Sequence, residues 1–472
     1  MENYKLTDLE NFEKISWAFI SEGNGKGSKV LHSYLDGSKN LLSIPGYSSS
    51  YFFPFIDKYF IEKNNEICNK FFYHFQSIFD SRKNPGSETL NMLGKNKKKF
   101  IIINKDLFKK KFLEYLSIKG SNKKNIFKAI HYAYFSACKK KFKDRIILSH
   151  VHVFKYFDKY IYKYFPNSKI ITLTSEPEVN FLRREKGSIL RPNFEKFFYT
   201  DFITSTIFSF YQICEFMIFG QQSLKNFKNV RLVKFEDIKT NKNKTIKSIM
   251  SFLNLDYSNI NKNMTFNNLK WNFSWYNDLL GSKKMIIFNN LVKNNLTFRH
   301  DEKKIINFIF YNFNKKYKYS NQETSKIEKI YLILKIIFPF HIELIHFFNF
   351  YKIKSIKKFI IETFSETKKI NSILEKYYGN NLFYTKKWTS SYFNFENKYL
   401  FIFYLKIKKN NFFKSILYKI IQIYYFISKI IFLLLSPLIF IKFYIKRIFL
   451  FYKFIIRDKL NLNFYPIPIT KK

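Results

Sequence analysis

Short apolar runs alternate, along the first half of the chain, with longer segments whose apolar positions recur at helical spacing. The apolar runs lie at residues 15–20, 100–103, 145–148, 169–174 and 230–235. We expect each run to form a strand. The spacing between them predicts helices over residues 106–116, 125–138, 153–164 and 202–216. This alternation indicates an α/β fold, a three-layer sandwich with a mainly parallel central sheet.

The first apolar run leads into a glycine-rich loop and then into an amphipathic helix. Residues 21–29 read Ser-Glu-Gly-Asn-Gly-Lys-Gly-Ser-Lys, and Val30, Leu31, Tyr34 and Leu35 share one face of the helix that follows. A strand–loop–helix of this kind presents backbone N–H groups and the positive end of a helix dipole to an anion. The three glycines of the loop allow a tight turn, and its two lysines add positive charge. We therefore predict that this loop holds a phosphate or sulfate group.

The pattern changes after about residue 320. Residues 327–348 form a strongly apolar amphipathic segment, a polar stretch follows, and residues 412–456 consist almost wholly of Ile, Phe, Leu, Tyr and Lys. We accordingly expect three regions: an α/β domain over 1–320, a helical polar-rich extension over 321–410, and an apolar-basic helical tail over 411–472.

The tail admits three arrangements. Residues 420–441 are long enough to cross a bilayer, although Lys429 and Pro437 interrupt the run. Alternatively, the tail forms a basic amphipathic helix that lies on anionic lipid. In the third arrangement its helices pack against the main domain. The pattern alone leaves all three open.

The charge balance is strongly basic, with 82 Lys and Arg against 35 Asp and Glu and a formal net charge of +47. Such a charge suggests nucleic-acid binding. However, the lysines are spread along the whole chain, and no RNP, zinc-finger or helix-turn-helix spacing accompanies them. We therefore do not expect nucleic acid to be the principal partner. A hydrophobic content of 46% also excludes a mainly disordered chain.

The cysteines and the first residues bear on the compartment. Cys68, Cys138 and Cys214 lie far apart and form no CxxC motif, which excludes a cysteine-built zinc site and a disulfide scaffold. The first residues, Met-Glu-Asn-Tyr-Lys-Leu-Thr-Asp, lack the basic start and apolar core of a signal peptide. We expect a cytoplasmic protein, whose association with a membrane depends on the tail.

Later segments add motifs in a fixed order. His150 and His152 stand at the end of the third predicted strand, and residues 165–177 read Phe-Pro-Asn-Ser-Lys-Ile-Ile-Thr-Leu-Thr-Ser-Glu-Pro. Residues 230–238 read Val-Arg-Leu-Val-Lys-Phe-Glu-Asp-Ile, and the next helix closes on Phe-Leu-Asn-Leu at 252–255. Together with the loop and its helix, these segments resemble the sulfotransferases that use 3′-phosphoadenosine 5′-phosphosulfate. The resemblance covers about residues 15–260.

The resemblance implies a role for each position of the loop. Gly27 and Ser28 fall on the family's Gly-Thr, whereas Gly25 stands where the family has a basic residue. Lys26 replaces a Ser and Lys29 replaces the last hydroxyl residue, so the positive charge is moved rather than lost. These five residues are expected to hold the 5′-phosphosulfate, with Lys26 also stabilising charge during transfer.

The resemblance also implies a 3′-phosphate site and a general base. Ser175 stands where the family has an Arg that holds the 3′-phosphate, and Arg183, with Arg184 beside it, occupies the position of the family's Ser. The guanidinium group is therefore expected from the following helix. His150 and His152 are the candidates for the base that takes a proton from the acceptor, because the pKa of imidazole lies near neutrality. Of the two, His150 is the one expected to activate the acceptor.

The resulting hypothesis is transfer of a sulfuryl group from the nucleotide donor to an acceptor hydroxyl or amine, on a carbohydrate, lipid or peptide, without a metal. The alternative is a catalytically inactive member of the fold that acts as a membrane-associated scaffold or partner-binding protein. The replacements at Gly25 and Ser175 are what this alternative predicts. A P-loop kinase is disfavoured, because Lys26 is followed by Gly27 rather than by Ser or Thr.

Overall fold

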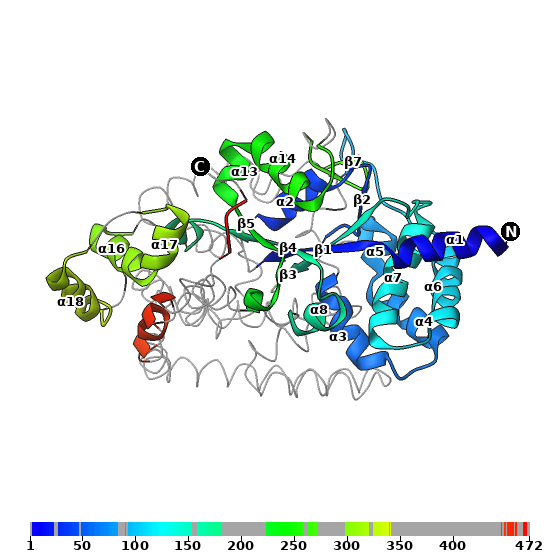
Figure 1. Ribbon diagram of the computed structural model, residues 1–472, viewed down its shortest axis with the longest axis horizontal. Coiled ribbons are helices and arrows are strands. Elements are labelled where there is room, and N and C mark those ends of the chain that lie inside the picture. The colour runs from blue at the N-terminus through cyan, green and yellow to red at the C-terminus, as the bar shows by residue number, and fades with distance from the viewer. Residues whose placement is uncertain are drawn as a thin grey trace, which may run out of the picture.

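A five-stranded parallel sheet with strand order β2-β3-β1-β4-β5 organises the protein (Figure 1). Its strands are β1 (Ser16–Glu22), β2 (Leu41–Ser43), β3 (Ile146–His152), β4 (Lys169–Thr174) and β5 (Val230–Lys234). The structure is a computed structural model. It describes residues 2–22, 27–46, 49–83, 90, 93–152, 158–181, 223–257, 263–271, 298–320, 324–338, 340, 445, 448–449, 451–456, 458–459 and 466–469.

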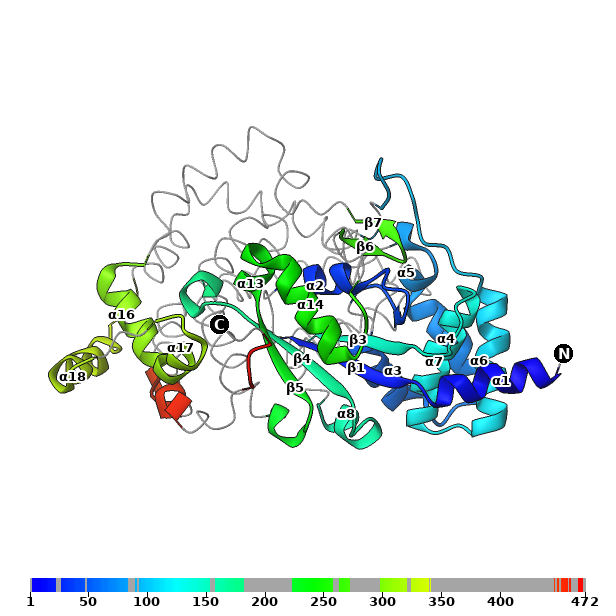
Figure 2. The same ribbon diagram turned by 45° about the horizontal axis from the view of Figure 1, so that its top comes forward.

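Helices cover both faces of the sheet, which gives three layers (Figures 1 and 2). One face packs against α2 (Ser28–Leu35), α13 (Phe235–Thr240) and α14 (Lys242–Leu253). The other face packs against α3 (Ser49–Tyr59), α7 (Lys123–Ala137) and α8 (Asp158–Tyr164). The same side carries α1 (Glu2–Glu13), α4 (Asn64–His74), α5 (Gln76–Phe79), the 3-10 turns Ser81–Lys83 and Ser223–Asn226, and α6 (Lys105–Lys119). The expected α/β sandwich is confirmed.

Burial on both faces explains why most of the strands could be read from the sequence. Along β1, Trp17 and Phe19 pack with the α3 and α7 side, whereas Ala18 and Ile20 pack with the α2 and α14 side. Successive side chains of a strand point to opposite faces, so a strand covered on both sides becomes a continuous apolar run.

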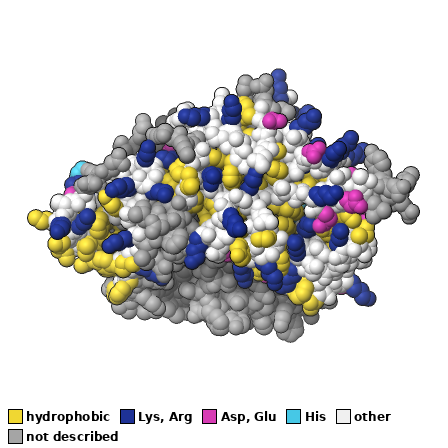
Figure 3. All heavy atoms as spheres, viewed as in Figure 1, with side chains coloured by type: hydrophobic (Ala, Val, Ile, Leu, Met, Phe, Trp, Pro, Cys, Tyr) yellow, Lys and Arg dark blue, Asp and Glu magenta, His cyan; other side chains and the backbone are white. Residues whose placement is uncertain are grey.

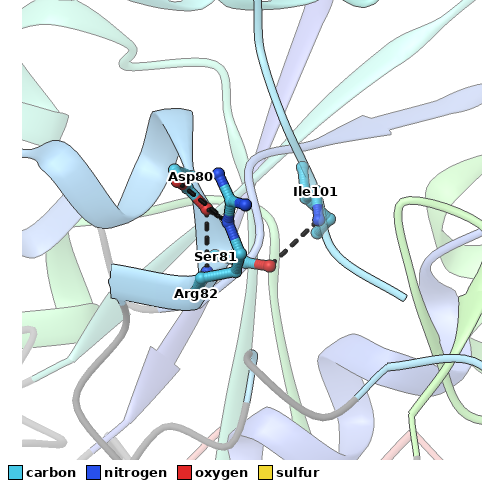
Figure 4. Close-up of polar contacts among 4 residues, drawn as sticks. All are labelled: Asp80, Ser81, Arg82 and Ile101. Carbon is cyan, nitrogen blue, oxygen red and sulfur yellow. Dashed lines mark hydrogen bonds and ion pairs between the residues drawn. The ribbon is translucent and has the colours of Figure 1, made fainter. Parts of the chain in front are cut away.

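The predicted strand at 100–103 is not part of the sheet. This segment runs beside residues 79–81, where the Ile101 N–H donates to the Ser81 hydroxyl at 2.9 Å (Figure 4). The Ser81 N–H donates in turn to the Ile101 carbonyl at 2.9 Å. The neighbouring Asp80 accepts hydrogen bonds from the backbone and the guanidinium of Arg82. The strand that forms this edge of the sheet is β2. It has only three residues, too few to give a recognisable pattern of apolar positions in the sequence.

The predicted helices agree with the structure where it describes them. Those at 106–116 and 125–138 correspond to α6 and α7, and that at 153–164 contains α8. The segment 202–216 lies outside the described residues.

A third apolar core lies beyond β5. It is formed by α16 (His300–Ile309), α17 (Tyr311–Tyr317), α18 (Lys326–Lys335) and the C-terminal residues 451–456. Asp458 accepts the N–H groups of Asn312 and Phe313 at 2.6 and 3.0 Å, which fixes this segment to the start of α17. The described parts of the tail therefore pack against the rest of the protein. Within the ranges that the structure describes, no helix is long and apolar enough to cross a membrane.

The chain near its C-terminus also extends the sheet. The Leu232 N–H donates to the Ile467 carbonyl at 2.9 Å, and the Ile469 N–H donates to the Leu232 carbonyl at 2.8 Å. Pro468 therefore sits beside β5 as a parallel bridge, and it covers an edge that would otherwise present unpaired backbone groups.

The buried carboxylate of Asp36 ties the end of α2 to the hairpin of β6 (Thr265–Phe266) and β7 (Leu269–Lys270). The carboxylate accepts the Thr265 hydroxyl at 2.9 Å, the Asn268 N–H at 3.2 Å and the Ser43 hydroxyl at 3.2 Å. The hairpin in turn positions Trp271, which is 1% exposed.

We predict that Asp36→Ala destabilises the protein by roughly 3 kcal/mol, because it leaves buried donors without an acceptor. Asp36→Asn keeps one acceptor oxygen and should cost less. Asp80→Ala is the matched control, because its partner Arg82 has a side chain that is 56% exposed, and such a pair contributes less than about 1 kcal/mol. Urea unfolding of the three variants measures the differences. Equal losses for Asp36→Ala and Asp80→Ala would contradict this role of Asp36.

Candidate anion-binding site

The carboxyl ends of the parallel strands meet at one edge of the sheet. Glu22, the last residue of β1, is in register with His152 of β3, and Ser21 is in register with Thr172 of β4. The strand order reverses at β1, and parallel α/β sheets bind ligands outside the carboxyl ends at such a point. The segments singled out in the sequence therefore converge on this edge.

The structure describes part of the predicted site. Gly27, Ser28 and Lys29 follow β1, His150 and His152 lie on β3, and Ser175 follows β4. Gly25, Lys26, Arg183 and Arg184 lie outside the described residues.

Gly27 starts α2 in a conformation that favours glycine. Its φ is 78°, and its carbonyl accepts the first helical hydrogen bond from the Leu31 N–H at 3.0 Å. The ring of Phe235 lies so close that a Cβ atom on Gly27 would be 2.0 Å from Phe235 Cε2. Both the backbone angle and the neighbouring ring therefore exclude a side chain at this position. This bare turn brings the first N–H groups of α2 to the edge of the sheet.

The next two residues of α2 are polar and buried. Ser28 is 1% exposed and Lys29 is 7% exposed. The ammonium of Lys29 lies 5.5 Å from the ring centroid of Trp271, a distance typical of a cation–π contact. The hairpin that Asp36 holds thus contributes an aromatic wall beside a cation of the predicted loop.

His150 lies two residues inside the edge and is 1% exposed. Its ring meets His32 of α2 edge-on, with 5.5 Å between the ring centroids, and His32 meets Phe266 at 5.3 Å. Neither ring nitrogen of His32 has a hydrogen-bond partner among the described residues. Burial, followed by the charges of His150 and Lys29, holds the pKa of His32 well below its usual range. His32 is therefore neutral in its contact with His150.

His152 differs from His150 in its place along β3. It is the last residue of the strand and is paired in register with Glu22, where β1 also ends. Of the two histidines, it is the one whose backbone lies at the carboxyl edge.

Two hydroxyl groups at the end of β4 are buried without a hydrogen-bond partner in the described part of the chain. Thr174 and Ser175 are both 0% exposed, and neither side-chain oxygen has a partner there. A buried hydroxyl without a partner is costly. Both hydroxyl groups therefore have a donor at the end of β4 that the described residues do not use.

Glu236, at the start of α13, joins three elements at this edge. One carboxylate oxygen accepts the Glu176 N–H at 3.2 Å, and the other accepts the Tyr319 hydroxyl at 3.0 Å. Burial, followed by the charges of Glu178 and Glu236, raises the pKa of Glu176. Glu236 thus has a structural role, because it links the chain after β4 to the chain just after α17.

The structure adds one cation that the sequence did not single out. Lys234 ends β5 in register with Thr174, is 8% exposed, and donates a hydrogen bond from its ammonium to the Tyr317 carbonyl. The same ammonium lies 4.7 Å from the ring centroid of Tyr319. In the sequence, the only sign of this buried cation is a lysine at the end of an apolar run. Its carbonyl partner lies in a helix distant along the chain, so the sequence did not predict the contact.

This combination of groups suits an anion. A helix N-terminus, buried hydroxyl groups and lysines all stabilise negative charge. Across the ranges that the structure describes, no group of three or more His, Cys, Asp or Glu side chains could hold a metal ion.

No family model matches the chain, and no curated protein matches it. Among solved structures, it has a distant similarity to a sulfotransferase domain from the curacin biosynthetic pathway. The TM-score is 0.31 and the sequence identity is 11%, over 60% of this chain and 99% of that one.

We predict that Gly27→Ala destabilises the protein by roughly 3 kcal/mol or more, because it combines an unfavourable φ with overlap against Phe235. The control is the same substitution in a Phe235→Leu background, where the ring atoms that the added Cβ would overlap are absent, so that part of the loss should be recovered. Thermal unfolding compares Gly27→Ala in the wild-type and Phe235→Leu backgrounds. An equal loss in both backgrounds would disprove the contact.

We predict that stability falls as the pH is lowered from 7.5 to 5, and that His32→Leu makes this fall shallower. An unfolded histidine takes up a proton near pH 6.5, about its ordinary pKa, whereas buried His32 stays neutral, so acid favours the unfolded chain. His74 and His131, whose pKa values burial lowers to about 4, contribute in the same direction. Phe266→Leu, which alters the same contact without a titrating group, should shift the melting temperature but keep the wild-type slope. An unchanged slope in His32→Leu would refute the assignment.

Proposed function

We propose that this protein is a sulfotransferase-like enzyme that transfers a sulfuryl group from 3′-phosphoadenosine 5′-phosphosulfate to an acceptor hydroxyl or amine. The observation that carries the proposal is Gly27, which immediately precedes α2 with a φ of 78° and lies against the Phe235 ring. The order of the four sequence segments supports it further, because their described parts all reach the same edge of the sheet.

In this proposal the loop after β1 holds the 5′-phosphosulfate. The N–H groups at the start of α2 donate to its oxygen atoms, and Lys26 and Lys29 balance its charge. Group transfer of this kind depends on in-line positioning and on stabilising charge at the bridging oxygen. A turn without side chains at Gly27 allows the close backbone approach that such contacts need.

The 3′-phosphate is assigned to the region after β4. The hydroxyl groups of Thr174 and Ser175 supply donors, and Arg183 and Arg184 supply the positive charge. Because Glu176 and Glu236 place negative charge close to Ser175, a neighbouring arginine is needed to make this region attractive to a phosphate.

The proposed chemistry requires one general base. The acceptor oxygen or nitrogen attacks sulfur, the bond from sulfur to the bridging oxygen breaks, and adenosine 3′,5′-bisphosphate leaves. A histidine takes the proton of the acceptor. His150 and His152 both remain candidates, and the end position of His152 on β3 favours it over His150, which is buried against His32.

We predict that adenosine 3′,5′-bisphosphate raises the melting temperature of the purified protein by several degrees at about 100 times its Kd, because it binds only the folded state. Lys26→Ala with Lys29→Ala should weaken binding by roughly tenfold or more. Exposed Lys141→Ala with Lys143→Ala is the matched control of equal charge. A flat titration of the wild-type protein would contradict donor binding and would favour the inactive scaffold.

A further inference from the structure

The outer face of α18 is apolar although it faces solvent. Ile327, Ile330, Tyr331 and Leu334 recur at helical spacing and are 81%, 61%, 48% and 56% exposed. Phe338, in the turn that follows, is 62% exposed and continues the series. We call these five residues the α18 stripe. Spacing of this kind ordinarily marks the buried side of a helix.

A second face of α18 already supplies its contacts with the rest of the protein. Leu332 and Ile336, which are both 0% exposed, pack into the third core with α16 and α17. The stripe is therefore not needed to attach the helix to the protein, and its exposure requires another explanation.

The neighbouring C-terminal segment has the same two-faced character. Phe451 and Phe454 are buried in the third core, whereas Phe449 and Ile456 are 71% and 61% exposed. The Tyr452 hydroxyl donates to the Ile333 carbonyl at 3.1 Å, so this segment lies against α18. Nine of the 17 large apolar side chains that are exposed in the described residues lie in α18, in the turn after it or in residues 445–456. Figure 3 shows hydrophobic side chains gathered at the end of the molecule that α18 forms.

Basic residues outnumber acidic ones around the stripe, where Lys335 of α18 pairs with Asp301 of α16 at 3.7 Å. Lys326 and Lys329 are exposed on α18, and Lys453 is exposed on the adjacent segment. The one acidic residue of α18, Glu328, pairs with Lys304 at 2.8 Å. The chain as a whole carries +47.

We propose that the α18 stripe is a membrane-docking surface, which inserts its apolar side chains into the interface of an anionic lipid bilayer while the flanking lysines contact the headgroups. A helix with an apolar face and lysines beside it lies in the plane of such an interface. Negative headgroups match the lysines, and the surface charge of the chain favours the approach. This proposal stands independently of the proposed sulfuryl transfer.

The test is flotation of the full-length protein with vesicles of phosphatidylcholine alone or with about 30 mol% phosphatidylserine. The wild-type protein should bind the anionic vesicles at least tenfold more strongly than the neutral ones. Ile327→Ser with Ile330→Ser and Leu334→Ser should reduce that binding by tenfold or more. Lys326→Gln with Lys329→Gln should reduce it by about fivefold per lysine.

Matched controls come from exposed isoleucines elsewhere. Ile61, Ile102 and Ile118 are 81%, 65% and 52% exposed, and their replacement by Ser should leave vesicle binding unchanged. Ile327→Ser alone, at the most exposed position of the stripe, tests whether weaker binding comes from misfolding. This variant should keep the wild-type melting temperature and still bind the vesicles more weakly. Wild-type binding by the triple stripe variant overturns the proposal. Failure of the wild-type protein to bind either kind of vesicle also overturns the proposal. That result would be found if the stripe mediated a contact with another protein instead.

Discussion

The close approach between the Phe235 ring and the Gly27 backbone is the constraint on which this site depends. Gly27 follows the central strand and Phe235 follows the strand two positions away, so the contact fixes the exits of β1 and β5 relative to each other. The intervening β4 must then deliver Thr174 and Ser175 between them. The sheet sets the spacing of these exits, and the absence of a side chain at Gly27 lets the backbone pass against the Phe235 ring.

The sequence was sufficient for those parts of the fold that local pattern determines. β1, β3, β4 and β5 appear as apolar runs because both faces of each strand are covered. The short strand β2 and the pairing of Ile101 with Ser81 depend on neighbours far along the chain, so no local pattern revealed them. Tertiary context decided these cases, as it often does for short strands.

The site divides in the same way. The turn at Gly27 was found because glycines and lysines between a strand and a helix have a local physical meaning. The contact of His32 with His150, and that of Lys234 with Tyr317, each join residues from separate elements and carried no sequence signal. Glycines in a loop predict its backbone conformation from the sequence alone. The environment of a buried imidazole or ammonium depends instead on how the layers pack, so local sequence does not predict it.

The pairing of Ile467 and Ile469 with Leu232 has a consequence for biosynthesis. β5 is translated long before the segment that covers its edge, so a nascent chain exposes an unpaired row of backbone groups while the rest of the protein is made. Contacts this distant in sequence also form slowly, because a long loop must close first. Completion of the sheet is therefore a late event, and the interval before it is when the chain is most exposed to pairing with another copy of itself.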